Sequence, residues 1–360
     1  MGLGRPGGAA AGGGGGEPLG LEEGDLRALH AHAIEARVYA EDSFGGFLPQ
    51  AGTARVVHWP RQQHRDASRG VRVDHALESG QVVSTSYDPM LGKVIAWGRD
   101  REDARAALLE ALDDTAVLGL TTNAGFLRQL VASDEFRDAT IDTAWLDTAE
   151  LPAPDPGTAR MLAAHAVAES LRRTASGPFG SDSWRASAGA APVTLRLDDE
   201  VVVHHVDGMS EIDGHRLRTL SCRELHDPPG GPGGAQRVEI DLDGSRHVLF
   251  LAHGPHRTEA VHRGQRFDLS APDLLAGGGQ AMAAGEVVAP MPGTVLVVDV
   301  RVGDRVIAGQ PLGAIEAMKM ELSLTAPFDG VVTGVGATVG DQVALGAPLF
   351  TVEAPGEPEE

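Results

Sequence analysis

Apolar and polar side chains repeat at two different periods in the first 150 residues. A period of two over residues 34–39 predicts a β-strand, with one apolar and one polar face. Its two faces are formed by Ile34, Ala36 and Val38, and by Glu35, Arg37 and Tyr39. Helical spacing predicts one helix over Glu102–Leu112 and a second helix from Asn123, a good N-cap. The inward residues are Ala104, Leu108, Leu109 and Leu112 in the first helix, and Phe126, Leu127 and Leu130 in the second. These elements predict a small α+β domain.

The middle of the chain begins after a proline-rich linker at 148–157. A helix is predicted over 158–173, and the residues available to its apolar side are Met161, Leu162, His165 and Leu171. Strands follow, as in the alternating stretch Arg237–Leu242, which ends at the hairpin signal Asp243-Gly244. Val193–Leu197 alternates in the same way, and Gly230–Gly234 is predicted to be a flexible loop. The pattern predicts one helix beside a β-barrel or curled sheet.

An internal repeat occupies the C-terminal part of the chain. Residues 289–316 and 326–353 align without gaps at an offset of 37, so that Gly293 matches Gly330 and Glu316 matches Glu353. Each half consists of short apolar strands broken by glycine turns, and neither half is large enough to bury its own apolar face. Two copies therefore predict a closed β-sandwich with pseudo-two-fold symmetry, since a solenoid needs about three or more repeats.

The segment 316–321, Glu-Ala-Met-Lys-Met-Glu, joins the two halves of the repeat. Symmetry places it at a hairpin tip, where Lys319 would be exposed and mobile on a rigid base, as a tethered cofactor requires. The flanking Met318 and Met320 are flexible apolar contacts that a modifying enzyme could read. The plainer interpretation is a solvated lysine in a polar turn, which leaves two exposed methionines unexplained.

Composition narrows the classes of function. The chain has 360 residues and a formal net charge of -21, which argues against nucleic acid or an anionic membrane surface as the main partner. Of its 30 Lys+Arg residues only Lys93 and Lys319 are lysines, a bias that codon usage explains. Because a primary amine can be acylated and a guanidinium effectively cannot, Lys319 is a candidate for covalent chemistry.

The same composition argues against an internal disulfide, a metal site and a transmembrane helix. Cys222 is the single cysteine, so no internal disulfide or cysteine-based metal cluster can form. The middle region has scattered histidines without metal-site spacing, namely His204, His205, His253, His256 and His262, and we expect no metal. No apolar run reaches about 18 residues, and the N-terminus lacks the apolar core of a signal peptide. A cytoplasmic protein is expected.

Two motifs in the repeat resemble biotin carboxyl carrier domains. Glu316-Ala-Met-Lys-Met320 is similar to the biotin attachment sequence, and Ala289-Pro-Met-Pro-Gly293 is similar to the run that precedes it. The resemblance implies that Lys319 is biotinylated by a biotin protein ligase, and that Met318, Met320 and Glu316 belong to the cofactor-binding site. Lipoyl domains share this fold, but their lysine usually follows an aspartate, which this chain lacks.

Three stretches of the first domain resemble the C-terminal domain of biotin carboxylases: His32–Asp42, Tyr87–Lys93 and Thr121–Arg128. The resemblance implies that Arg37 lies at the active site and stabilises the enolate of biotin, a task suited to a planar cation. The interpretation from the residues alone is an arginine in a surface ion pair. Asp88 and Lys93 are expected to hold the loop and the sheet together.

The departure from this family concerns the ATP-grasp fold, which precedes the matching region in full biotin carboxylases. Here residues 1–20 are glycine- and alanine-rich and are expected to be disordered. ATP and Mg²⁺ are therefore expected only through a missing or separate ATP-grasp module, and the chain alone is not expected to carboxylate biotin. It is interpreted as a fragment of a longer subunit or a carrier that works with a separate biotin carboxylase.

The expected organisation is multidomain α+β and β. The predicted units are 21–147, like the C-terminal domain of biotin carboxylase; 158–276, a helix-plus-β-barrel interaction domain; and 284–354, a biotinyl/lipoyl-type sandwich, preceded by the linker Gly277–Gly279. By position, the middle unit resembles the part of acyl-CoA carboxylase α subunits that docks to a carboxyltransferase β subunit.

The leading hypothesis is the biotin-carrying portion of such an α subunit, a component of a ligase-class carboxylase. A non-enzymatic carrier and scaffold, and a lipoyl carrier of a 2-oxoacid dehydrogenase, are the alternatives. The acyl-CoA stays open among acetyl-, propionyl- and 3-methylcrotonyl-CoA, with geranyl-CoA less favoured.

Overall fold

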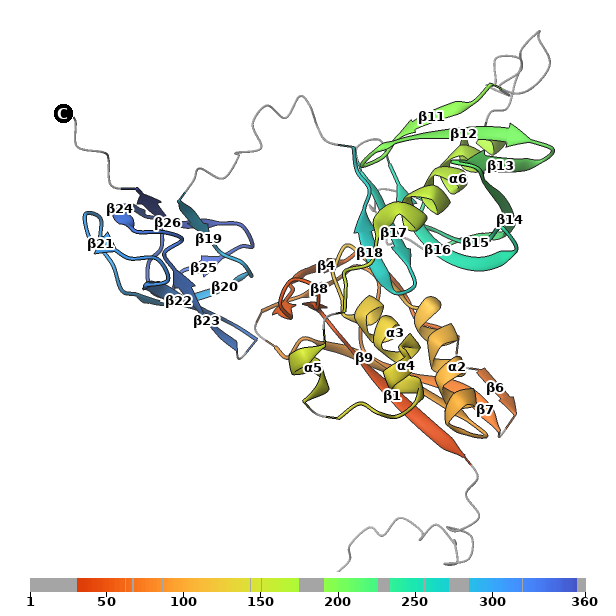
Figure 1. The fold of residues 1–360 in the computed structure, drawn as a ribbon, viewed down its shortest axis with the longest axis horizontal. Coiled ribbons are helices and arrows are strands. Elements are labelled where there is room, and N and C mark those ends of the chain that lie inside the picture. The colour runs from red at the N-terminus through yellow and green to blue at the C-terminus, as the bar shows by residue number, and fades with distance from the viewer. Residues whose placement is uncertain are drawn as a thin grey trace, which may run out of the picture.

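The computed structural model describes residues 31–354, apart from 62, 67, 86, 143, 150, 175–190, 226–233, 255–256, 272–284 and 319. Lys319, the linker Gly277–Gly279, the stretch 1–20 and most of the loop Gly230–Gly234 lie outside the described residues. Figure 1 shows three groups of elements, which we call the N-terminal unit, the middle unit and the C-terminal sandwich.

The N-terminal unit is a four-stranded antiparallel sheet in the order β1-β9-β7-β6, with smaller strand pairs and helices packed around it. Its strands are β1 (His32–Tyr39), β2 (Glu41–Asp42), β3 (Leu48–Pro49), β4 (Gly52–Ala54), β5 (Val56–His58), β6 (Gln63–Asp66), β7 (Arg69–His75), β8 (Gln81–Val83), β9 (Met90–Gly98) and β10 (Ala116–Leu118). Its helices are α2 (Arg101–Asp113), α3 (Ala124–Ala132), α4 (Asp134–Arg137) and α5 (Trp145–Thr148).

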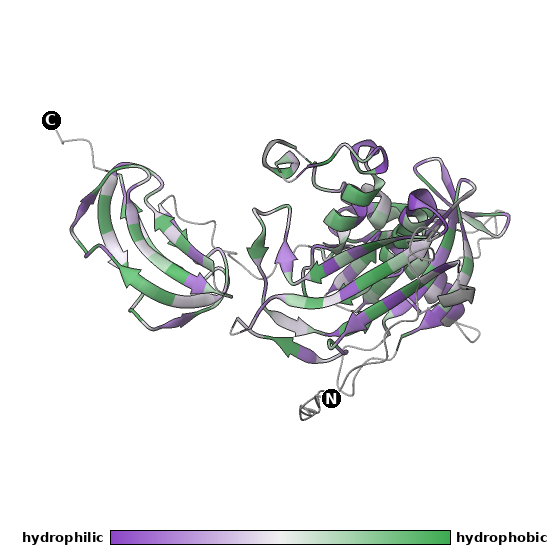
Figure 2. Ribbon diagram, turned by 90° about the horizontal axis from the view of Figure 1, so that it is seen from below, coloured by the Kyte–Doolittle hydropathy of each residue, from purple (hydrophilic) through white to green (hydrophobic). Residues whose placement is uncertain are grey.

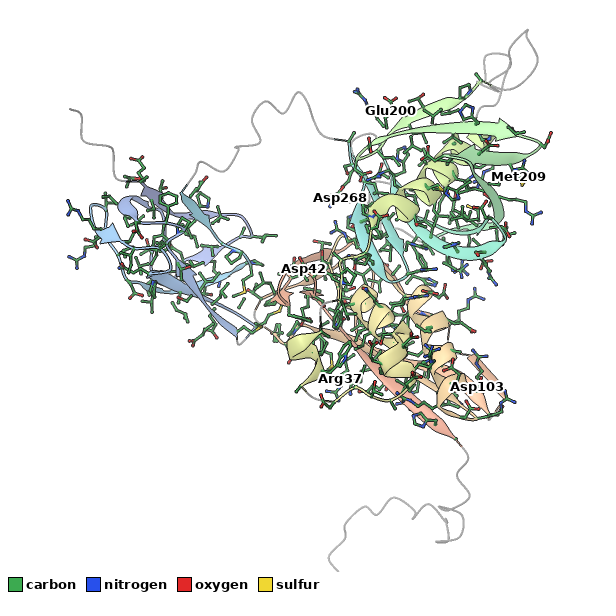
Figure 3. The ribbon with its side chains drawn as sticks, in the orientation of Figure 1. Arg37, Asp42, Asp103, Glu200, Met209 and Asp268 are labelled. Carbon is green, nitrogen blue, oxygen red and sulfur yellow. The ribbon has the colours of Figure 1, made fainter. Side chains whose placement is uncertain are left out.

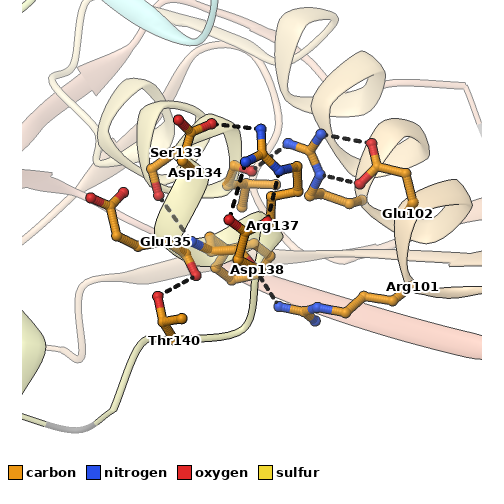
Figure 4. Close-up of polar contacts among 11 residues, drawn as sticks. Arg101, Glu102, Ser133, Asp134, Glu135, Arg137, Asp138 and Thr140 are labelled. Carbon is orange, nitrogen blue, oxygen red and sulfur yellow. Dashed lines mark hydrogen bonds and ion pairs between the residues drawn. The ribbon is translucent and has the colours of Figure 1, made fainter.

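The predicted faces of β1 and α2 are confirmed, whereas in α3 only Phe126 of the predicted inward residues is buried. Along β1, Ala36 and Val38 are buried while Arg37 is exposed, and α2 buries Ala104, Leu108 and Leu112 against the sheet. A polar belt joins the ends of the helices: the Ser133 hydroxyl caps α4, and Arg101 donates to the Phe136 carbonyl at 2.7 Å (Figure 4). Burial of the apolar faces fixes the helices on the sheet, and the belt fixes where α4 begins.

Asn123 begins α3 as predicted, but its side chain makes no capping hydrogen bond. Its Oδ1 accepts from the Tyr39 amide at 2.9 Å, and its Nδ2 donates to the Arg37 carbonyl at 3.2 Å. Asn123 is buried, so both bonds are shielded from water. The residue fastens β1 to α3 instead of capping the helix.

The middle unit is the long helix α6 (Pro156–Thr174) against one eight-stranded antiparallel sheet, in which neighbouring strands follow one another along the chain (Figure 1). Its strands are β11 (Val193–Arg196), β12 (Glu200–Val206), β13 (Met209–Ile212), β14 (His215–Glu224), β15 (Gln236–Leu242), β16 (Ser245–His253), β17 (Thr258–His262) and β18 (Gln265–Asp268). The structure records no pairing of β11 with β18 in the described part of the chain, so of the two predicted forms the sheet takes the curled one, a half-barrel, and not the closed barrel.

Helix α6 is buried on more sides than its pattern predicts. Leu162 and His165 are buried as expected, but Leu171 is 50% exposed. The sheet instead curls closely around a run of small residues, Ala163, Ala164, Ala166, Val167 and Ala168. His165 bonds the hydroxyls of Ser210 at 2.8 Å and Thr219 at 2.9 Å, which satisfies both nitrogens of its ring.

The C-terminal sandwich consists of two four-stranded sheets in the orders β19-β26-β24-β21 and β23-β22-β20-β25. Its strands are β19 (Glu286–Val288), β20 (Gly293–Val298), β21 (Arg305–Val306), β22 (Pro311–Ala317), β23 (Met320–Thr325), β24 (Gly330–Val335), β25 (Gln342–Val343) and β26 (Pro348–Glu353). A shift of 37 residues carries β20 onto β24, β21 onto β25 and β22 onto β26. The two sheets are therefore equivalent, as the repeat predicts.

The repeat also explains the glycines that the two halves share. A Cβ added at Gly293 would collide with the Glu316 carbonyl, and one added at Gly330 would collide with the Glu353 carbonyl. These contacts are equivalent under the 37-residue shift, so each glycine permits the same close approach of two strands. The alternation of hydrophobic and polar positions along these strands is visible in Figure 2. The inward set forms one core that includes Val295, Ile315 and Val332.

The N-terminal and middle units share a joint. Glu259 of β17 is fully buried and accepts from Arg55 of the N-terminal unit, from Arg266 and from the Gly119 amide. Burial alone would raise the pKa of Glu259, but Arg266, the Gly119 amide and Arg55 hold it below its usual value. A small apolar cluster crosses the same joint and contains Val56, Ala116, Leu118, Ala235, Phe250, Ala252 and Val261.

Candidate functional site

The predicted attachment segment forms the tip of the hairpin β22–β23. Ala317 pairs with Met320 and Glu316 pairs with Glu321, so positions 318 and 319 are the two residues of the turn. Met318 has φ of 48°, the left-handed conformation that two-residue hairpin turns demand. Lys319 lies outside the described residues. The tip therefore follows directly from a register that two packed sheets hold in place.

The surroundings of the tip differ from the prediction in one respect. Met320 is exposed as expected, but Met318 is buried, with 7% of its surface exposed. The Met318 amide donates to the Thr85 carbonyl of the N-terminal unit at 3.1 Å. A cavity of about 200 Å³ lies beside this contact and is lined by Thr85, Tyr87, Thr294, Glu316, Ala317, Met318 and Gln342. The tip thus meets the loop that precedes β9, a contact without any sequence signal.

Arg37, the other predicted site residue, lies on β1 of the N-terminal unit, where Figure 3 labels it. Its side chain is 58% exposed, and its Nε donates to Glu35 Oε1 at 2.9 Å. This hydrogen bond, and one with Tyr39, raise the pKa of Arg37 above its usual value. Arg37 is therefore a fixed, solvent-facing cation in a surface ion pair, the arrangement that the residues alone predict.

Strand β9 brings Lys93, the lysine other than Lys319, next to Arg37. Lys93 is the cross-strand partner of Arg37, and its Nζ lies 4.0 Å from Glu35 Oε1. Asp88 accepts from the Met90 amide at 3.0 Å and so shapes the loop that leads into β9. Asp88 thus stabilises the loop and Lys93 contacts the neighbouring strand of the sheet, as predicted for them. The loop that receives the tip is continuous with the strand beside Arg37, although no hydrogen bond or ion pair joins Arg37 to the described residues of the tip.

Three of the histidines singled out in the sequence have separate partners, and His204 is exposed. His253 bonds Thr258, His262 bonds His247, and His205 lies 3.8 Å from Glu169; His256 lies outside the described residues. Within the described ranges, no group of three His, Cys, Asp or Glu side chains could hold a metal ion. Likewise, none of the helices in those ranges has the length and apolar composition that crossing a bilayer requires.

Family models match two parts of the chain. Residues 35–148 match the biotin carboxylase C-terminal domain, and residues 285–352 match the domain of biotin-requiring enzymes. The first range covers the N-terminal unit with Arg37, and the second covers the C-terminal sandwich with its tip. The chain thus combines a domain of biotin carboxylases with a biotinyl-type domain.

Curated relatives extend this match over most of the chain. The chain is 31% identical to the methylcrotonoyl-CoA carboxylase subunit alpha of Oryza sativa, over 81% of its length, and 30% identical to the human propionyl-CoA carboxylase alpha chain, over 86%. The Dictyostelium discoideum methylcrotonoyl-CoA carboxylase subunit alpha is 27% identical over 85%. The chain is therefore related to the alpha subunits of biotin-dependent acyl-CoA carboxylases. It spans less than half of these relatives: 45%, 44% and 46% of the three.

Solved structures give partial likenesses with low TM-scores. The biotin carboxylase domain of the Hydrogenobacter thermophilus 2-oxoglutarate carboxylase is 30% identical over 32% of this chain and 24% of its own, with a TM-score of 0.30. A single-chain, multi-domain long-chain acyl-CoA carboxylase is 23% identical over 89% of this chain and 21% of its own, with a TM-score of 0.29. These likenesses add nothing to the sequence matches.

Proposed function

We propose that the chain is the biotin-carrying portion of an acyl-CoA carboxylase α subunit, with biotin attached to Lys319. The observation that carries the proposal is the two-residue turn at the tip of β22–β23, within a sandwich that matches biotin-requiring enzymes. The residues fit such a group: the register places position 319, a lysine in the sequence, in the turn, and Met320 beside it is exposed. Bound biotin supplies a ureido nitrogen that accepts and releases a carboxyl group.

The C-terminal sandwich contributes to this function by holding the hairpin tip in a defined position. Its core holds β22 and β23 in one register, so that the direction of the tip is fixed while the lysine side chain supplies reach. A tether of this kind replaces two bimolecular encounters by local ones and raises the effective concentration of the carried group. Met318 and Met320 are proposed to be the apolar contacts by which a biotin protein ligase recognises the tip.

Arg37 is proposed to stabilise negative charge that develops on the carried group when the tip visits the N-terminal unit. The side chain faces solvent, and the buried Asn123 holds the backbone from the Arg37 carbonyl to the Tyr39 amide. A cation that is already held in position stabilises an anion with little cost in reorganisation energy. The hydrogen bond from Met318 to Thr85 supports a docking place for the tip on the same unit.

The assignment of domains and partners belongs to the same proposal. The three units correspond to a carboxylase C-terminal domain, an interaction domain that binds a carboxyltransferase β subunit, and a carrier domain. The ATP- and Mg²⁺-dependent step is assigned to a missing or separate ATP-grasp module, because neither of the two matched domains is an ATP-grasp domain. The acyl-CoA substrate is assigned to the carboxyltransferase.

Intact-mass measurement after co-expression with a biotin ligase tests the proposal. We expect a gain of one biotinyl group in the unmodified chain and none in Lys319→Arg. Lys93→Arg is the matched control, because it removes the only other lysine, and we expect it to be biotinylated fully. A lipoyl mass, no mass gain, or biotin on Lys319→Arg would contradict the proposal.

A further inference from the structure

A cavity of about 600 Å³ lies where α3 of the N-terminal unit meets the half-barrel of the middle unit. Its size is within the usual range of small-molecule sites. Its walls come from α3, from the linker before α6, and from the hairpins β15–β16 and β17–β18. It shares no lining residue with the cavity beside Met318, and the proposed carrier function makes no use of it.

The lining of this cavity is divided into an apolar part and a cationic part. The apolar part includes Ala132, Pro152, Pro154, Leu242 and Phe267. The cationic part is formed by Arg128 and Arg263, beside which lie His247 and His262. The one carboxylate in the lining, Asp155, accepts from the Gly157 amide at 3.1 Å, at the start of α6. A ligand that fits both parts has an anionic head and an apolar chain.

The charges at the cationic part are incompletely balanced. Arg128 pairs with Asp113 at 2.9 Å, whereas Arg263 forms no ion pair with any described carboxylate. Partial burial and then the charge of Arg128 lower the pKa of Arg263, and the charge of Asp113 offsets them only in part. Burial lowers the pKa of His262 to about 3, so this histidine is neutral and cannot repel Arg263.

The backbone gives an independent reason to single out Arg263. Four hairpins of the half-barrel have two-residue turns, and three of them carry Asp-Gly: Asp207-Gly208, Asp213-Gly214 and Asp243-Gly244. Aspartate tolerates the left-handed conformation that this turn demands. The fourth turn is Arg263-Gly264, and Arg263 adopts φ of 53°. Of the two hairpins that line the cavity, β17–β18 thus has an arginine where the other turns have a favoured aspartate, and such local strain often marks a function.

We propose that this cavity binds a small organic anion with an apolar chain. Arg263 and Arg128 hold the anionic head, and Leu242, Phe267 and Pro152 contact the chain. The ligand contacts both units, so it is expected to stabilise their joint. The site goes beyond the proposed carrier function and does not depend on it.

Titration calorimetry on the full chain tests this site with five probes. Octanoate and octyl phosphate carry a head and a chain, octanol lacks the charge, and acetate and inorganic phosphate lack the chain. We expect one site for octanoate or octyl phosphate, at least about tenfold tighter than for the other three probes, since a charge-assisted contact and a buried chain are each worth about that much. The better of the two probes identifies the head as carboxylate or phosphate.

Arg263→Asn removes the charge and suits the left-handed turn, so this variant is expected to fold at least as stably as the parent chain. We expect it to weaken octanoate or octyl phosphate binding by about tenfold or more. Arg218→Gln, which removes an exposed arginine of β14 outside the cavity, is the matched control and should bind as the parent does. Absence of binding, equal binding by Arg263→Asn, or equal binding of octanol, acetate or inorganic phosphate would overturn the proposal.

Discussion

Two joints of the molecule are built in different ways. The joint between the N-terminal and middle units contains a buried carboxylate, Glu259, between Arg55 and Arg266, and an apolar cluster that both units share. Between the N-terminal unit and the C-terminal sandwich, the described contacts are the hydrogen bond from Met318 to Thr85 and the packing of Leu48 against the sandwich core.

The difference in construction predicts a difference in mobility. Separating the first joint would expose apolar surface and leave charges without their partners, which is costly. The hydrogen bond at the second joint can be exchanged for one to water, and such bonds contribute only about 0.5–1.5 kcal/mol net. The N-terminal and middle units should therefore move as one body, and the C-terminal sandwich should detach and return, as the proposed carrier role requires.

Glu259→Gln should have the largest effect, because it keeps the shape of the side chain and leaves Arg55 and Arg266 without their carboxylate. We expect a loss of about 3–5 kcal/mol in the free energy of unfolding, measured by urea denaturation. Unfolding of the C-terminal sandwich should be unchanged.

The exposed pair of Asp134 and Arg137 provides the control for this variant. Asp134→Asn should change the free energy of unfolding by less than about 0.5 kcal/mol, since exposed ion pairs contribute little. Equal losses in the two variants would contradict a special role of the buried carboxylate.

Acid should destabilise the middle unit through His165. Burial lowers its pKa from 6.5 to about 4. As the pH falls below about 6.5, the unfolded chain takes up a proton that the folded chain refuses until about pH 4. Stability is therefore complete above this window and about 2 kcal/mol lower by about pH 5.

Tryptophan fluorescence can follow this acid effect across the joint, because Trp59 and Trp97 lie in the N-terminal unit. His165→Gln should be less stable at pH 7 and should show a shallower dependence on pH. His215→Gln, which removes a half-exposed histidine, should keep the slope of the parent chain. An unchanged slope in His165→Gln would refute the assignment.

Asn123→Ala tests how the N-terminal unit holds Arg37. The substitution leaves the Tyr39 amide and the Arg37 carbonyl without their partner. We expect a loss of about 1–2 kcal/mol by urea denaturation, at the lower end for unpaired groups because Tyr39 is only half-buried. Protection of the Tyr39 amide from hydrogen exchange should fall as well, whereas preserved protection would show that Asn123 is dispensable.

Met318→Asn should have the smallest effect on stability and the clearest effect on recognition. Asparagine tolerates the left-handed turn, so the C-terminal sandwich should gain up to about 1 kcal/mol. Biotinylation by the ligase should become slower, because an apolar contact is lost. Equal rates of mass gain for this variant and the parent would contradict a role of Met318 in recognition.

The sequence predicted the C-terminal sandwich in detail because every position is constrained twice. Gly293 and Gly330, like Val295 and Val332, occupy equivalent places in two equivalent sheets. The offset of 37 therefore predicts which strands correspond in the two sheets. The hairpin tip follows from the same symmetry, and its turn at 318–319 is confirmed. Burial of Met318 was missed, because it depends on Thr85, which is distant in sequence.

Patterns failed where burial is set by distant partners. Glu259 lies in a strand of five buried residues, and its partner Arg55 is 204 positions away. Asn123 has the residue type and position of a cap, but bonds a strand instead. Helix α6 has no single apolar face to detect, because a curled sheet surrounds its alanines. Local periodicity likewise left open whether the sheet of the middle unit is a closed barrel or a curled sheet.

Nitrogen-15 relaxation of the backbone amides in the full chain tests most directly whether the two joints differ. The account predicts one rotational correlation time for the N-terminal and middle units, and a shorter one for the C-terminal sandwich. A single correlation time for all three units would show that the sandwich is fixed in place, and would contradict the proposed carrier role.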